Sequence, residues 1–204
     1  MIDPRMLTLI AITDGMADGE AGLLRRAAAA ALGGATMLQL RLKDADARSL
    51  VEVARALVET LSIPVIVNDR VDVALASGAA GVHLGVDDLP VSAARAIVPD
   101  GFIIGVSVGS DAEISGSAGA DYAGIGPVFG TRSKSDAGVS IGVAEFARLS
   151  ARTGLPSVGI GGVTPVNARE VIDAGAAGVA VISALLAAKD PAEAARSLRS
   201  AIGR

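Results

Sequence analysis

Two aspartates follow successive apolar runs of the chain, in positions that suit a divalent cation. Asp69 and Asp88 each come after the end of such a run. If the two runs are adjacent parallel strands, both carboxylates lie at one edge and can share a Mg2+, which prefers oxygen ligands and usually takes one or two carboxylates plus substrate phosphates. The alternative is structural, because Asn68 and Asp69 would suit the cap of a helix beginning near Val71, and Asp87 and Asp88 would suit a turn.

Basic and glycine residues near the ends of other apolar runs suit anionic ligands. Arg41, Lys43 and Lys134 would bind one anionic group through charge-assisted hydrogen bonds. Gly161 and Gly162 precede a helical segment, where backbone N–H groups can hold a second phosphate. Each signal alone has a simpler explanation: ion pairs at a strand end, a solvated loop, or a tight turn that requires glycine. Their joint placement is what favours a functional site.

The only histidine of the chain, His83, lies between Val82 and Leu84 in an apolar run. This alternation predicts that it lies within a strand, as a hydrogen-bonded residue of the core rather than a catalyst. The chain has no cysteine, so disulfides, thiolate nucleophiles and cysteine-ligated metals are excluded, and one histidine excludes a site built on two imidazoles.

Composition predicts one soluble domain. The chain has 204 residues, of which 51% are hydrophobic, enough for one sizeable core. The net charge of −4, the scattered basic residues and the 2% aromatic content argue against nucleic acid as a partner. No apolar run reaches the ~18 residues of a membrane span, and no export leader is evident, so we expect a cytoplasmic protein without membrane contact. The oligomeric state stays open, and a homo-oligomer is compatible with the sequence.

Short β-branched runs alternate with alanine-rich helical segments along the whole chain. The expected strands cover residues 7–13, 36–42, 64–68, 81–84, 102–107, 122–126, 156–160 and 178–182. Strands without polar alternation are typical of parallel sheets covered on both faces. Eight such units predict a single (β/α)8 barrel over residues 1–204. An open doubly wound sheet is the rival, but "ITDGMADG" stands where a GxGxxG turn would be expected.

In such a barrel the functional face is the rim formed by the carboxyl ends of the strands. Polar side chains lie near the carboxyl end of nearly every expected strand or in the loop after it: Gln39, Arg41, Lys43, Asn68, Asp69, Asp87, Asp88, Ser107, Thr131, Arg132, Ser133, Lys134, Asp136, Thr164 and Ser183. The longest connection, residues 127–142, has a length typical of functional or disordered loops.

Eight segments, in order and over nearly the whole chain, resemble the thiamine phosphate synthase family. They are "LQLRLKD", "VIVNDRVDVAL", "GVHLGVDDLP", "IGVSV", "ADYAGIGPVF", "TRSK", "VGIGGV" and "GVAVIS". The resemblance implies a (β/α)8 transferase that requires Mg2+. It implies a reaction of 4-amino-2-methyl-5-hydroxymethylpyrimidine diphosphate with a thiazole phosphate, with or without an extra carboxylate, to give thiamine phosphate and pyrophosphate.

The resemblance also implies roles for particular residues. Asp69 and Asp88 would be the metal ligands. Gln39, Arg41, Lys43, Asn68 and Lys134 would surround the pyrimidine diphosphate, with Ser107 near the reacting groups. Thr131, Ser133, Gly161 or Gly162, Ile182 and Ser183 would hold the thiazole phosphate. Arg41, Lys43, Ser107 and Lys134 are the residues we expect to act in catalysis.

The chain departs from the family pattern at Val86, where glutamine is common, and at Gly130 and Ser133 in "GTRSK". A related thiazole tautomerase is an alternative, but its members carry a histidine where this chain has Pro127. A non-catalytic barrel that binds thiamine intermediates is a second alternative, which would not need the magnesium carboxylates. A phosphate-binding isomerase is a third, and would need a Glu or Lys base inside the barrel.

Overall fold

The computed structural model describes residues 2–130 and 139–203, and they form a closed barrel of eight parallel strands in sequential order, β1 to β8. The strands are β1 (Leu9–Ile12), β2 (Met37–Leu40), β3 (Val65–Asn68), β4 (Gly81–Leu84), β5 (Ile103–Val108), β6 (Tyr122–Ile125), β7 (Ser157–Ile160) and β8 (Gly178–Val181). Every strand lies within the range expected from the sequence or within one residue of it. The predicted (β/α)8 fold is confirmed.

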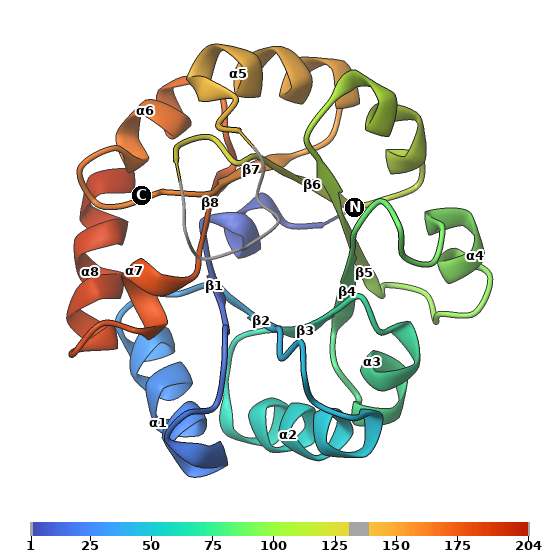
Figure 1. Ribbon diagram of the computed structural model, residues 1–204, viewed down its shortest axis with the longest axis vertical. Coiled ribbons are helices and arrows are strands. Elements are labelled where there is room, and N and C mark those ends of the chain that lie inside the picture. Colours follow the sequence, from blue (N-terminus) through green and yellow to red (C-terminus); the bar gives the residue numbers. More distant parts are fainter. Residues whose placement is uncertain (1, 131–138, 204) are drawn as a thin grey trace.

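Helices surround the strands as a ring (Figure 1). The α-helices are α1 (Gly19–Leu32), α2 (Ala47–Thr60), α3 (Val71–Ser77), α4 (Val91–Arg95), α5 (Gly142–Thr153), α6 (Ala168–Asp173), α7 (Ser183–Leu186) and α8 (Pro191–Ile202). Two 3-10 helices complete the fold, η1 (Pro4–Leu7) before β1 and η2 (Asp111–Ser117) between β5 and β6. Within the described ranges, no helix is long and apolar enough to cross a membrane.

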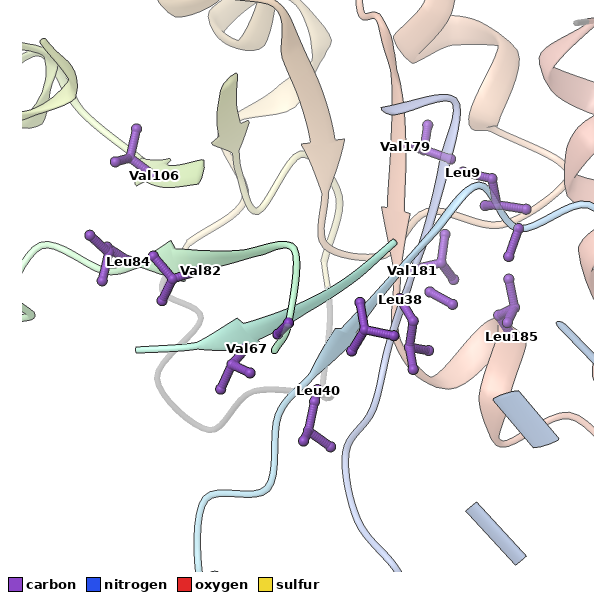
Figure 2. Close-up of a cluster of buried hydrophobic side chains, with 14 of the residues drawn as sticks. Leu9, Leu38, Leu40, Val67, Val82, Leu84, Val106, Val179, Val181 and Leu185 are labelled. Carbon is purple, nitrogen blue, oxygen red and sulfur yellow. The ribbon is translucent and has the colours of Figure 1, made fainter. Parts of the chain in front are cut away.

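Strand alternation divides the apolar side chains into two cores. One set faces the helices and includes Leu38, Val67 and Val82, which Figure 2 shows together with other side chains of this cluster from β1, β2, β4, β5 and β8. The other set faces the barrel axis, where Leu7 of η1 and Ile10 of β1 close the amino-terminal end. Toward the opposite end, the carboxyl halves of four strands carry the polar residues Gln39, Asn68, His83 and Ser107.

Helix ends follow the expected turn chemistry. Gly78 ends α3 in the left-handed conformation with φ 74°, which glycine adopts without steric cost. Asp46 caps α2, because its carboxylate accepts hydrogen bonds from the backbone N of Ser49 at 3.0 Å and from the Ser49 hydroxyl at 2.9 Å. These bonds, the backbone bond first, hold the pKa of Asp46 below its usual 3.8.

We expect Asp46→Ala to lower the free energy of unfolding at pH 7, because it removes the side-chain cap of α2. Since the folded-state pKa of Asp46 is depressed, its contribution is present above the unfolded pKa of about 3.8 and is lost as the pH falls through the lower folded value. The difference between wild type and variant in urea denaturation should therefore shrink below pH 3.8.

Asp44→Ala is the matched control. Asp44 is exposed two residues away and has no hydrogen-bond partner in the described part of the chain. If Asp44→Ala and Asp46→Ala lower the free energy of unfolding equally, the negative charge near the start of α2 is what stabilises the protein, and the cap is not.

Candidate active site at the carboxyl rim of the barrel

A pocket of about 460 Å3 opens at the carboxyl ends of the strands. Its volume is in the range typical of small-molecule sites. Eight of the residues expected from the sequence line it: Arg41, Lys43, Asn68, Asp69, Asp88, Ser107, Gly161 and Ile182. These residues come from strand ends and loops that are far apart in the sequence, and barrel closure brings them together.

Arg41 is the most buried charged residue of the pocket, with 8% of its surface exposed. Its backbone is locked to the first strand, because Arg41 N donates to the Thr13 hydroxyl at 2.7 Å and that hydroxyl donates to the Arg41 carbonyl at 2.9 Å. No carboxylate pairs with the guanidinium in the described ranges. A buried cation without a protein counter-ion is suited to an anionic ligand.

Gln39 lies deeper, under the pocket, and is 4% exposed. Its side-chain Nε2 donates to Asn68 Oδ1 at 2.6 Å, so the two amides form a pair between β2 and β3. The pair uses the Asn68 carbonyl, which leaves the Asn68 NH2 group to face the pocket that Asn68 lines. Gln39 therefore sets the orientation of Asn68 rather than lining the main pocket itself.

Asp69 has φ 64°, the single positive φ outside glycine in the described chain. Its N–H donates to the His83 carbonyl at 2.8 Å, and the next N–H, of Arg70, donates back to the Asn68 carbonyl at 2.8 Å. The result is a three-residue turn centred on Asp69 directly after β3. Strained backbone of this kind is concentrated at functional sites. The capping alternative is wrong, because Arg70 precedes α3 and no side chain caps that helix.

Asp88 both closes a turn and lines the pocket, as the two interpretations of the sequence predict. Its Oδ2 accepts from Gly85 N at 2.6 Å and Gly85 O accepts from Asp88 N at 3.3 Å, so it closes the turn after β4. The same side chain lines the pocket, as do Asp69 and Asp87. The turn bonds hold the Asp88 carboxylate in a defined position beside the cavity.

The donor set fits a magnesium ion held jointly with a substrate. Asp69 and Asp88 follow neighbouring strands and both line this cavity, where their carboxylate oxygens would be suitable ligands. The described residues contain no group of three or more His, Cys, Asp or Glu side chains able to hold a metal. Two carboxylates with the remaining positions filled by water and phosphate oxygens is the usual Mg2+ arrangement.

A smaller cavity of about 80 Å3 adjoins the pocket and shares Ile160, Gly161 and Ile182 with it. Gly162 and Ser183 also line it. Both glycines have positive φ, 91° at Gly161 and 65° at Gly162. A Cβ on Gly161 would lie 2.5 Å from Pro127 Cβ, so both backbone conformation and space require glycine here.

Five of the polar residues expected at this rim lie outside the described residues: Thr131, Arg132, Ser133, Lys134 and Asp136. Val86, the departure beside Asp88, is 69% exposed and lines the pocket mouth. It therefore presents an apolar side chain where an amide would be expected.

The prediction that strand position buries His83 within the core was wrong in one respect. His83 is hydrogen-bonded, as expected, but it is only partly buried and lines the pocket. Alternation placed it correctly on the inner face of β4. It could not indicate that this position lies in the uppermost layer of the barrel, next to the cavity.

Glu113 of η2 is a pocket residue that the sequence analysis did not single out. Its carboxylate accepts from Gly109 N and from the Ser110 hydroxyl, both at 2.8 Å. It thereby holds the loop that follows β5. The S-x-x-E spacing of Ser110 and Glu113 is the signal that could have found it, since this spacing marks a helix start.

Comparison with known proteins places these residues in a family. The model of the thiamine monophosphate synthase family matches residues 9–185. A thiamine-phosphate synthase of Azorhizobium caulinodans is 50% identical over 99% of this chain and 98% of its own. One of Methanoculleus marisnigri is 52% identical over 85% of this chain and 84% of its own. The solved thiamine phosphate pyrophosphorylase from Pyrococcus furiosus is 38% identical, with a TM-score of 0.87 over 98% of this chain and 97% of its own.

The left-handed backbone at Asp69 can be tested by stability alone. Asp69→Gly and Asp69→Ala both remove the carboxylate and differ only in backbone preference. We expect the glycine variant to be the more stable by about 1 kcal/mol, because a Cβ is unfavourable in this conformation. Urea denaturation of the two variants measures the difference.

The usual order is the reverse, since glycine elsewhere lowers stability by roughly 0.5–1 kcal/mol relative to alanine. An alanine variant as stable as the glycine variant would show that the turn after β3 does not hold Asp69 at positive φ.

Proposed function

The chain belongs to the thiamine monophosphate synthase family and is a transferase of thiamine biosynthesis, and we propose that it couples two small substrates at the rim pocket. The first is 4-amino-2-methyl-5-hydroxymethylpyrimidine diphosphate, and the second is a thiazole phosphate, with or without a carboxylate. The products are thiamine phosphate and pyrophosphate, and a carboxylated thiazole would also release its carboxylate as carbon dioxide. The buried guanidinium of Arg41, without a protein counter-ion in the described ranges, is the observation that carries the proposal.

Arg41 and Lys43 bind the diphosphate. Both line the pocket, and a guanidinium can contact two phosphate oxygens at once. Their charges stabilise the negative charge that accumulates on the diphosphate as it leaves. Asn68, oriented by Gln39, supplies a further donor from the adjacent strand. Lys134 is proposed as an additional cation at this group on the family resemblance alone.

Asp69 and Asp88 hold the Mg2+. When bound, the ion neutralises negative charge on the diphosphate oxygens. The turn holds the backbone of Asp69, and the bond to Gly85 N holds the Asp88 carboxylate, so the Asp88 carboxylate is positioned before the substrate arrives. The small number of protein ligands makes the substrate part of the metal site.

The adjoining small cavity binds the phosphate of the thiazole. Gly161 and Gly162 allow their backbone N–H groups to approach a ligand closely, and Ser183 brings a hydroxyl. Ile182 lines both cavities and would contact the ring between them. Thr131 and Ser133 are proposed on the family resemblance to complete this subsite.

The proposed chemistry needs no enzyme nucleophile and no general base. The C–O bond to the diphosphate breaks, with both electrons leaving on pyrophosphate, and a pyrimidine-methyl cation stabilised by the ring amino group remains. The lone pair of the thiazole nitrogen then forms the new C–N bond. The residues therefore contribute charge stabilisation and proximity, which agrees with a chain without cysteine.

Incubation of both substrates with Mg2+ should release pyrophosphate and form thiamine phosphate in equal amounts. Arg41→Gln should lower kcat/KM for the pyrimidine diphosphate by about 100-fold, the usual effect of losing one strong donor to developing charge. Coupled pyrophosphate detection and chromatography of the product measure both quantities.

Arg55→Gln is the control, because Arg55 is exposed, does not line the pocket, and among the described residues bonds only the carbonyl of Ala76. No product from the wild-type protein would contradict the synthase proposal. Equal kinetics for Arg41→Gln and wild type would contradict the diphosphate site.

The metal site gives a separate prediction. Asp69→Asn and Asp88→Asn keep side-chain shape but remove one negative charge each, so each should raise the Mg2+ concentration for half-maximal activity by about 10-fold or more. Activity is titrated with Mg2+ at saturating substrates. Asp100→Asn, an exposed aspartate remote from the pocket, is the control. An unchanged Mg2+ requirement in both variants would show that these carboxylates do not hold the ion.

A further inference from the structure

Three polar side chains form a chain of hydrogen bonds inside the barrel that reaches the pocket. Tyr122 Oη on β6 lies 2.9 Å from His83 Nδ1 on β4, and His83 Nε2 lies 3.1 Å from Ser107 Oγ on β5. The tyrosine and histidine rings are tilted by 43° with centroids 5.5 Å apart. The proposed reaction assigns no task to His83 or Tyr122, so this arrangement needs an explanation.

Two glycines make the space for these rings. Tyr122 and His83 lie on strands separated by β5, and Tyr122 reaches across β5 at Gly105. A Cβ on Gly105 would lie 2.5 Å from Tyr122 Oη, so any larger residue would block the contact. On β6, a Cβ on Gly124 would lie 3.1 Å from His83 Cε1. The barrel interior is therefore shaped around this pair.

The direction of the first hydrogen bond follows from the burial of Tyr122. The side chain is 1% exposed, and burial raises the pKa of its phenol well above the usual value, so it stays protonated. Within the described part of the chain, His83 Nδ1 is its one hydrogen-bond partner. A buried O–H must donate to its available acceptor or stay unsatisfied, which is unfavourable. Tyr122 therefore donates to His83 Nδ1.

The direction of the second bond follows from the first. In a neutral imidazole one nitrogen accepts and the other carries the proton. Because Nδ1 accepts from Tyr122, Nε2 carries the proton and donates to Ser107 Oγ. The Ser107 hydroxyl hydrogen is then directed away from the histidine. Ser107 lines the pocket, so this hydrogen is available to a ligand there.

We propose that Tyr122 is a positioning residue that fixes the neutral Nε2–H form of His83 and so turns the Ser107 hydroxyl into a donor directed at the pocket. The acceptor is an atom of the pyrimidine diphosphate, either a ring nitrogen or a diphosphate oxygen. This last step rests on the proposed function, whereas the tautomer of His83 does not. A donor already oriented before the substrate binds loses no free energy to reorientation during the reaction.

The single histidine of the chain makes the tautomer directly measurable. In protein labelled with 15N-histidine, the two ring nitrogens of His83 give one pair of NMR signals, whose shifts report which nitrogen carries the proton. We expect Nε2–H at neutral pH in the wild-type protein without substrates. An Nδ1–H form or a doubly protonated ring at that pH would overturn the proposal. In Tyr122→Phe, the signals should move toward a mixture of tautomers.

Kinetics test whether Tyr122 acts through Ser107. Ser107→Ala should lower kcat by about 100-fold, as the loss of one oriented donor does. Tyr122→Phe, which keeps the Ser107 hydroxyl but not its orientation, should lower kcat by about 10-fold with little change in KM. If Tyr122 acts through Ser107, the double variant should be no slower than Ser107→Ala. Multiplicative losses in the double variant would overturn the positioning role.

A structural role of Tyr122 gives a different result. Loss of packing or stability would lower the thermal unfolding midpoint but leave the tautomer of His83 and the coupling to Ser107 unchanged, and that outcome also overturns the proposal. A wild-type protein without synthase activity would overturn the proposed function and the target of Ser107. The NMR result would still confirm or overturn the tautomer.

Discussion

Each strand of the barrel is hydrogen-bonded to a neighbour on both sides, so the sheet has no free edge and the carboxyl ends of all eight strands lie on one rim. For this reason Arg41 after β2, Asp69 after β3 and Ser107 on β5 all line one pocket. The geometry of the site is therefore a property of barrel closure. The local sequence around each residue decides its chemistry, and closure decides which residues act together.

The inner face of the barrel meets two opposed demands. Its lower layers need apolar side chains, and Ile10, Met37 and Ile66 supply them. Its upper layer faces the pocket and carries polar groups, which are stable there only because they are hydrogen-bonded. The Gln39–Asn68 pair and the chain from Tyr122 to Ser107 satisfy this requirement. These hydrogen bonds also orient the polar groups that face the cavity, the Asn68 amide and the Ser107 hydroxyl. The same bonds therefore satisfy the buried polar groups and position side chains of the site.

Charge in the pocket is divided between the protein and its ligands. Arg41 is buried without a protein counter-ion in the described ranges, and Asp69 and Asp88 line the same cavity. The described residues contain no group of three or more His, Cys, Asp or Glu side chains able to hold a metal. A diphosphate bound with a magnesium ion would supply negative charge to the Arg41 guanidinium and phosphate oxygens to the metal. The positive φ of Asp69 is consistent with a role in ligand binding, because backbone strain of this kind is unfavourable for folding and is concentrated at functional sites.

The sequence by itself determined the fold class, the eight strands and the rim on which the polar residues lie. These depend on local patterns: β-branched runs, helical periodicity and glycine at turns such as Gly78. It also excluded chemistry that needs cysteine or two histidines. Only the tertiary structure decided which inward residues reach the pocket and which are buried beneath it. His83 and Gln39 alternate in their strands in the same way, yet one lines the main cavity and the other lies below it, because depth along the barrel axis depends on the stagger between strands. The contact of Tyr122 with His83 spans a third strand, so no pattern within either segment could indicate it.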